Sequence, residues 1–113
     1  MHEYSIVQAL VERVAAEAQA RQATSVQRLS IRIGELSGVE PELLTTAYET
    51  FRERTICEGA ALDLQMVAAR WECPDCGRVI GRGDRLTCPV CAVPAHLVQG
   101  DEIMLDRIEM EVP

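Results

Sequence analysis

Two short cysteine motifs constrain the fold of this chain more than any other feature of its sequence. Cys73-Pro74-Asp75-Cys76 and Cys88-Pro89-Val90-Cys91 share the form Cys-Pro-X-Cys, with eleven residues between them. A turn with two intervening residues lets both of its thiolates face one ion, and two such turns complete a tetrahedron of sulfur ligands. The pair therefore predicts a four-cysteine metal site on a short hairpin.

Zn(II) is the ion that we expect at Cys73, Cys76, Cys88 and Cys91. Four sulfur ligands leave no open coordination position, so a zinc ion here is expected to hold the structure and to take no part in catalysis. An iron centre of the rubredoxin type and a redox-active dithiol are the alternatives. The redox alternative is disfavoured because neither motif opens a helix within a βαβ unit.

The rest of the chain has the periodicities of two helices. Residues 4–22 carry apolar side chains at intervals of three and four, which is typical of a helix with one buried stripe. These side chains are Ile6, Val7, Leu10, Val11, Val14 and Ala18. Ser5 and Gln8 are expected to form a capping box at its start. A second helix is expected to begin at Pro41, where the missing N–H is tolerated, and to end before Gly59 with Cys57 on it as a buried apolar residue.

Three further segments predict strands. Leu29, Ile31 and Ile33 alternate with polar residues, and residues 61–69 show the same period of two. In residues 102–112 the apolar positions change parity between Leu105 and Ile108. This change predicts either a β-bulge near Asp106 or Arg107, or a strand that is buried on both faces.

The segment between the second and third strands cannot form a core of its own size. Residues 70–100 are rich in Cys, Pro and Gly, so they need the metal as a staple. We therefore expect an α+β fold in which two helices pack on a three-stranded β-sheet, with an inserted zinc-ribbon module. Residues 1–69 and 101–113 would form one discontinuous α/β domain, and residues 70–100 the zinc-ribbon domain.

Charge and hydropathy exclude several classes of partner. The formal net charge is -7, whereas binding to nucleic acid or to an anionic membrane depends on clustered Lys and Arg. No segment reaches the roughly 20 apolar residues of a membrane helix, and the first residues carry no basic region before an apolar core. A cytoplasmic location is expected, and in a reducing compartment paired cysteines indicate a metal before they indicate disulfides.

The N-terminus offers a second set of metal ligands of a different kind. The amine of Met1, the backbone nitrogen and imidazole of His2, and the backbone nitrogen of Glu3 can surround one ion in a square plane. Square-planar nitrogen ligands suit Ni(II) or Cu(II) and do not suit zinc. We expect Met1 to be retained, because a bulky second residue blocks its removal. The simpler alternative is a chain end without a function.

Taken together, these motifs resemble the HypA/HybF family of hydrogenase nickel incorporation proteins. The resemblance rests on Met1-His2-Glu3, on residues 33–41 (Ile-Gly-Glu-Leu-Ser-Gly-Val-Glu-Pro) and on the two Cys-Pro-X-Cys motifs, in that order along the chain. It implies a nickel metallochaperone for the maturation of [NiFe] hydrogenase, with the hydrogenase large subunit and a nickel-binding GTPase of the HypB family as partners. A homodimer is a further expectation.

The family resemblance also implies roles for particular residues. His2 would bind nickel with Met1 and Glu3 as neighbours, and the four cysteines would bind zinc. Glu40 stands where some members carry an acidic residue near the nickel site, and His96 is expected to be an exposed loop residue. The rival interpretations are a zinc-ribbon adaptor without a nickel role and a small zinc hydrolase or deaminase. The enzyme is disfavoured because no His-X-Glu motif accompanies the cysteines.

Overall fold

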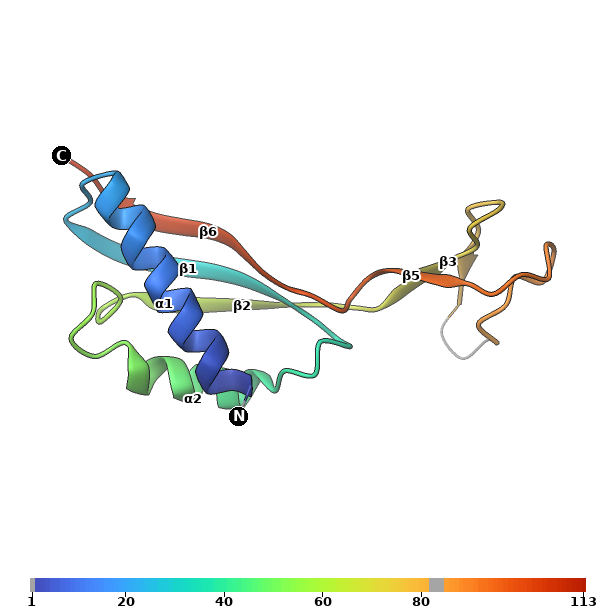
Figure 1. The fold of residues 1–113 in the computed structure, drawn as a ribbon, viewed down its shortest axis with the longest axis horizontal. Helices are drawn as coiled ribbons and strands as arrows, with labels where there is room; N and C mark the ends of the chain where they lie inside the picture. The colour runs from blue at the N-terminus through green and yellow to red at the C-terminus, as the bar shows by residue number, and fades with distance from the viewer. Residues whose placement is uncertain (1, 82–84) are drawn as a thin grey trace.

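The chain forms two lobes joined by a narrow waist (Figure 1). The computed structural model describes residues 2–81 and 85–113, and for His2 it describes the backbone alone. The molecule measures 56 × 29 × 17 Å. The larger lobe holds both helices and one three-stranded sheet, and the smaller lobe holds a second three-stranded sheet. No helix of the described part combines the length and the apolar composition needed to cross a bilayer.

Helix α1 (His2–Ala20) buries the stripe predicted from its periodicity. Its innermost residues are Val7, Val11, Val14 and Ala18. The helix begins at His2, so Ser5 lies within its first turn and the prediction of a capping box at Ser5 is wrong. The apolar stripe predicted the helix but not the residue at which it begins, because the first turn is held by a contact between Glu3 and a residue distant in sequence.

Helix α2 (Pro41–Phe51) begins as expected, with Glu40 as the N-cap and Pro41 in the first turn. It ends earlier than the sequence indicated, because Arg54 adopts a φ of 64° that a right-handed helix cannot contain. Cys57 therefore lies in the turns that follow the helix, and its placement on the helix was wrong. Its predicted burial is confirmed, because none of it is exposed.

The central sheet has the order β2-β1-β6. Strand β1 (Ser25–Gly34) pairs in parallel with β2 (Ala61–Val67) and antiparallel with β6 (Ile103–Glu111). The predicted alternation in β1 is confirmed, since Leu29, Ile31 and Ile33 are buried. Both helices pack on the face of the sheet that carries these side chains.

The bulge predicted from the change of parity in the last strand is confirmed. Ser30 pairs with Arg107 and Ile31 pairs with Leu105, which leaves Asp106 without a partner in the ladder. The extra residue returns both halves of β6 to the same face. As a result the apolar side chains on either side of the bulge all pack against the core; they are Ile103, Leu105, Ile108 and Met110.

The smaller lobe contains three short antiparallel strands in the order β4-β3-β5. They are β3 (Arg70–Glu72), β4 (Val79–Ile80) and β5 (His96–Gln99). Its core consists of Cys73, Ile80 and Cys88, with Trp71 and Val93 packed against them. A core this small agrees with the expectation that residues 70–100 need a metal to hold them.

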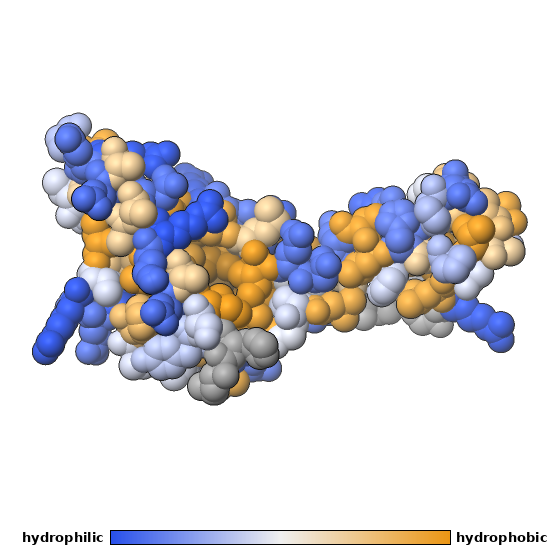
Figure 2. All heavy atoms as spheres, viewed as in Figure 1, coloured by the Kyte–Doolittle hydropathy of each residue, from blue (hydrophilic) through white to orange (hydrophobic). Residues whose placement is uncertain are grey.

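At the waist three stretches of backbone lie against one another. A Cβ at Gly34 would stand 2.3 Å from the carbonyl of Gly100, and one at Gly100 would stand 2.5 Å from the Cα of Ala69. The N–H of Leu36 donates to the Gly100 carbonyl (2.6 Å), and the Ala69 N–H donates to Glu35 Oε1 (2.7 Å). The loop after β1 thus holds both connections between the lobes. Figure 2 shows hydrophobic side chains gathered beside this waist.

Candidate metal centres

The two cysteine motifs fold into turns with the same backbone hydrogen bonds. In the first, Gly77 N–H donates to the Cys73 carbonyl (2.9 Å), and in the second Ala92 N–H donates to the Cys88 carbonyl (2.9 Å). The residue after the second cysteine has a positive φ in both turns, 76° at Gly77 and 57° at Ala92. The repeated motif therefore produces two equivalent turns, although only the first has a glycine where this conformation is unstrained.

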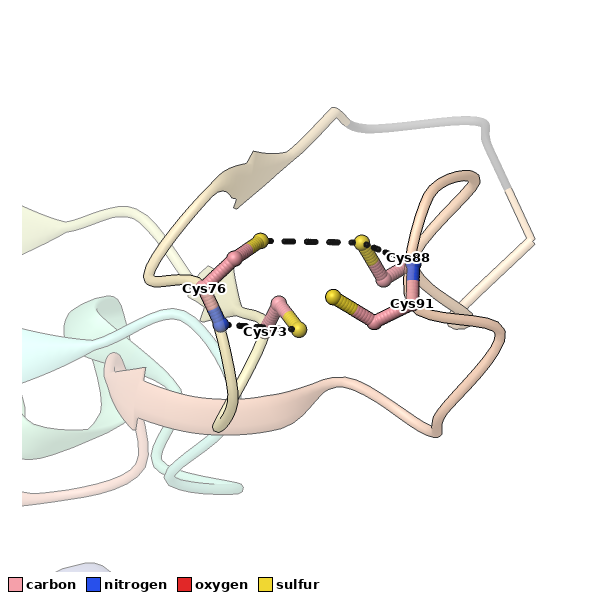
Figure 3. Close-up of side chains that lie close together, drawn as sticks. All are labelled: Cys73, Cys76, Cys88 and Cys91. Atoms are coloured by element: carbon pink, nitrogen blue, oxygen red, sulfur yellow. Dashed lines mark hydrogen bonds between the residues drawn. The ribbon is translucent and has the colours of Figure 1, made fainter.

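The four sulfurs converge on one point between the turns (Figure 3). All four lie within 4.8 Å of one another, and Cys76 Sγ and Cys88 Sγ are 3.8 Å apart. A tetrahedron with zinc–sulfur bonds of about 2.3 Å has edges of about 3.8 Å. The arrangement therefore fits a tetrahedral ion with four thiolate ligands. Cys73 and Cys88 are buried, while Cys76 and Cys91 lie nearer the surface.

Backbone N–H groups point at the sulfurs, as metal-binding turns of this kind require. The N–H groups of Asp75 and Cys76 donate to Cys73 Sγ (3.4 and 3.5 Å), and that of Cys91 donates to Cys88 Sγ (3.4 Å). The N–H groups of Cys91 and Val90 lower the pKa of Cys88 to about 7. The neighbouring sulfurs, Cys76 first among them, raise the pKa of Cys91 to about 12. Four thiolates this close repel one another, so a bound cation is what allows all four to be deprotonated.

The N-terminal candidates are only partly described. Met1 and the side chain of His2 lie outside the described residues, so the structure does not place the amine or the imidazole. The backbone of His2 and Glu3 forms the first turn of α1, where N–H groups have no acceptor within the helix.

The side chain of Glu3 has a structural role that the sequence did not reveal. Its carboxylate is buried (8% of the residue is exposed), and Oε2 accepts the N–H of Glu40 at 3.1 Å. This bond joins the first turn of α1 to the N-cap of α2 across 37 residues of sequence. It also brings Glu40, whose own side chain is exposed, beside the start of α1. Only the burial of an acidic residue in a first turn would have indicated this, and burial is not visible in a sequence.

Two candidates remain, His96 and Cys57. His96 is exposed as expected, but it lies in β5 opposite Glu72 and not in a loop. Within the described ranges, the group able to hold a metal comprises the four cysteines without His96. Burial raises the pKa of the Cys57 thiol, which agrees with its interpretation as a core residue.

Comparison with known proteins decides the family. The family model described as "Hydrogenase/urease nickel incorporation, metallochaperone, hypA" matches residues 1–110. The chain belongs to the HypA family. The predicted resemblance is thereby confirmed, and the chain is a hydrogenase maturation factor of the nickel metallochaperone type.

Relatives of this chain match it along nearly their whole length. A hydrogenase maturation factor HypA from Shewanella oneidensis is 42% identical over 113 residues, which is 98% of this chain and 96% of the relative. The Aquifex aeolicus HypA is 37% identical, with 99% of each chain covered.

Solved HypA structures have the same fold. The solution structure of the Ni metallochaperone HypA from Helicobacter pylori is 33% identical, covers 98% of each chain and gives a TM-score of 0.75. A second HypA solution structure is 34% identical, covers 100% of this chain and 98% of its own, and gives a TM-score of 0.81. The α+β fold expected from the sequence is confirmed by these matches together with the strands and helices described above.

Proposed function

We propose that this chain binds Ni(II) at its N-terminus and delivers it to the large subunit of a [NiFe] hydrogenase. The ligands would be the Met1 amine, the backbone nitrogen and imidazole of His2, and the backbone nitrogen of Glu3. These four nitrogens form adjoining chelate rings and the square plane that Ni(II) prefers. Nickel is the transferred ion in this proposal and passes to the acceptor protein.

The bond between the Glu3 carboxylate and the Glu40 N–H is the observation that carries this proposal. It fixes the first turn of α1 on the N-terminus of α2, so the nitrogens of His2 and Glu3 would be held at a defined place and not on a free chain end. A carboxylate beside a helix N-terminus is also favoured by the helix dipole. Glu40 would be an additional acidic group near the ion, and the bond of its N–H to the Glu3 carboxylate supports this role.

The four cysteines would hold a structural zinc ion, and the protein would not be an enzyme. Cys73, Cys76, Cys88 and Cys91 fill all four positions of a tetrahedral ion, which leaves none for a substrate or an activated water. Under this proposal residues 70–100 form the zinc-ribbon domain, and residues 1–69 and 101–113 form the nickel-binding domain. A HypB-family GTPase would be the second partner, and the cytoplasm the compartment.

Release of nickel is expected to follow from the chemistry of its ligands. The backbone nitrogens bind only after they lose a proton, so affinity should fall as the pH falls. The imidazole of His2 binds only in its neutral form, which adds to this dependence. A partner that offers competing ligands can then replace one nitrogen at a time.

A nickel titration of the untagged, zinc-loaded chain tests the proposal. We compare it with a variant that has residues added before Met1, and with His2→Ala. Both should lose most of the nickel affinity and the absorption bands of square-planar Ni(II), because the first lacks the free amine and the second the imidazole. Zinc content should not change.

His96→Ala is the matched control, because His96 is the other histidine of the chain and is exposed in the smaller lobe. It should bind nickel as the parent does. Equal affinity in the parent, the extended variant and His2→Ala would refute the N-terminal site and would favour the zinc-ribbon adaptor.

A further inference from the structure

The smaller lobe has a different balance of charge from the rest of the chain. Residues 70–100 contain four arginines and three acidic residues, whereas residues 1–69 and 101–113 contain seven arginines and fifteen acidic residues. The formal charges are therefore +1 and -8, which add to the -7 of the whole chain. Four thiolates with a zinc ion would bring the smaller lobe only to -1. An acidic partner is consequently repelled less at the smaller lobe, which stands apart from the larger one (Figure 1).

A groove lies in this lobe between β4 and the second cysteine turn. Its volume is about 510 Å³. Val79 (54% exposed), Ile80 (5% exposed) and Pro89 give it an apolar lining. An apolar side chain of a partner would be removed from water there, which favours binding. Strand β4 is also an outer strand of its sheet, so a partner segment can lie beside it in an extended conformation.

Two arginines line the same groove. Arg78 comes directly before β4, and Arg85 comes three residues before Cys88. Both are exposed, and neither forms an ion pair with another described residue, in contrast to Arg70, which binds Glu72 at 2.8 Å. None of the described residues that line the groove is acidic. The groove therefore combines an apolar lining with two guanidinium groups, each of which can bind a carboxylate through two hydrogen bonds.

We propose that this groove binds an acidic segment of a partner protein. The segment lies extended beside β4, and one of its apolar side chains covers Val79 and Ile80. Carboxylates on either side of that side chain bind Arg78 and Arg85. Charge decides the occupant, because a basic segment would be repelled by both guanidinium groups. A nucleic acid fits less well, because its binding depends on a larger cluster of basic residues than these two.

The alternative role for the two arginines is to offset the charge of the thiolates, since Cys88 also lines the groove. Backbone N–H groups already serve that purpose, because Cys88 Sγ accepts the N–H of Cys91 at 3.4 Å. The two roles differ in what the arginines affect. Arginines that serve the metal site determine the affinity for zinc, and arginines that serve a partner determine the affinity for an acidic segment at constant zinc content.

NMR titration of the zinc-loaded, isotope-labelled full chain with synthetic peptides tests the proposal. The capped peptide Glu-Asp-Leu-Phe-Asp-Glu should shift the amide signals of Val79 and Thr87 and leave those of α2 unchanged. Its amide counterpart, Gln-Asn-Leu-Phe-Asn-Gln, should bind at least about fivefold more weakly, because the carboxylates are gone. A peptide with alanine in place of leucine and phenylalanine should be weakened to a similar degree, because the apolar contact is lost.

Variants of the groove should weaken binding of the acidic peptide without a change in zinc content. Arg78→Glu and Arg85→Glu should each weaken it about tenfold, because attraction becomes repulsion. Val79→Ser should weaken it about threefold. Arg54→Glu makes the same change of charge at an exposed turn of the larger lobe, and Val98→Ser removes another exposed valine of the smaller lobe. Both controls should bind the peptide as the parent does.

Several outcomes would overturn the proposal. Equal affinity for the acidic peptide and its amide counterpart would remove the role of charge, and signal shifts confined to the larger lobe would remove the site. Arginine variants that lose zinc affinity but keep their affinity for the peptide would assign the arginines to the metal site. An oligothymidine that binds the groove more tightly than the peptide would assign it to nucleic acid. No nickel is present in these measurements, so the proposed function at the N-terminus stands or falls separately.

Discussion

The substitution Gly34→Ala tests whether the waist is as tightly packed as its backbone distances indicate. The added Cβ would lie 2.3 Å from both the carbonyl carbon and the oxygen of Gly100, and 2.7 Å from the Asp101 nitrogen. All three are backbone atoms, so no side chain can rotate away. The connection between the lobes must move, and the bond from Gly34 N–H to the Glu102 carbonyl (2.8 Å) is strained with it. Overpacking of this kind costs about 1–3 kcal/mol, and we expect about 2 kcal/mol of lost stability.

Urea unfolding of the zinc-loaded chain measures this loss, and Gly59→Ala is its matched control. A Cβ at Gly59 meets no atom within 4 Å, and Gly59 is not among the glycines with positive φ. The same chemical change should therefore raise the free energy of unfolding by about 0.4–1 kcal/mol, because alanine restricts the unfolded chain. A Gly34→Ala variant as stable as the parent would contradict the packing argument.

Three other outcomes follow from single features of the structure. Ala92→Gly should strengthen zinc binding by about 1 kcal/mol, as measured by chelator competition, because a left-handed φ is strained for alanine. Removal of zinc should abolish the amide-exchange protection of residues 70–100 and leave that of β1 intact, because the small lobe has so few buried side chains. Burial raises the pKa of Tyr48 to about 12, so the free energy of unfolding should fall as the pH rises from about 10 to about 12. Tyr48→Phe should remove this contribution to the pH dependence, although it also removes the bond from the Tyr48 hydroxyl to the Ala60 carbonyl (2.9 Å).

Elements with a strong internal period were predictable from the sequence. The apolar stripe of α1 and the alternation of apolar and polar residues in β1 each indicate which face of the element is buried. The bulge at Asp106 was predictable for the same reason, because one extra residue shifts the apolar positions of β6 by one. The convergence of the four sulfurs was predictable from spacing alone, since each turn sets the distance between its own two cysteines.

Errors arose where no periodic pattern in the sequence reported the outcome. The start of α1 is held by the bond from Glu40 to Glu3, and no local signal reports it. The end of α2 depends on Arg54 entering a conformation that its residue type rarely adopts. His96 was assigned to a loop because a strand as short as β5 has too few residues to show a period.

The amino-acid sequence by itself determined the two helices and three strands of the larger lobe, the metal chemistry of the cysteines and the family, because period, spacing and residue type are local properties. Tertiary structure decided how the parts are joined. It placed Gly34 against Gly100, and the Glu3 carboxylate against the Glu40 N–H, across 66 and 37 residues of chain. It also left the outer edge of β6 open. Such contacts depend on which backbones meet after folding, and the position of residues along a chain does not reveal that.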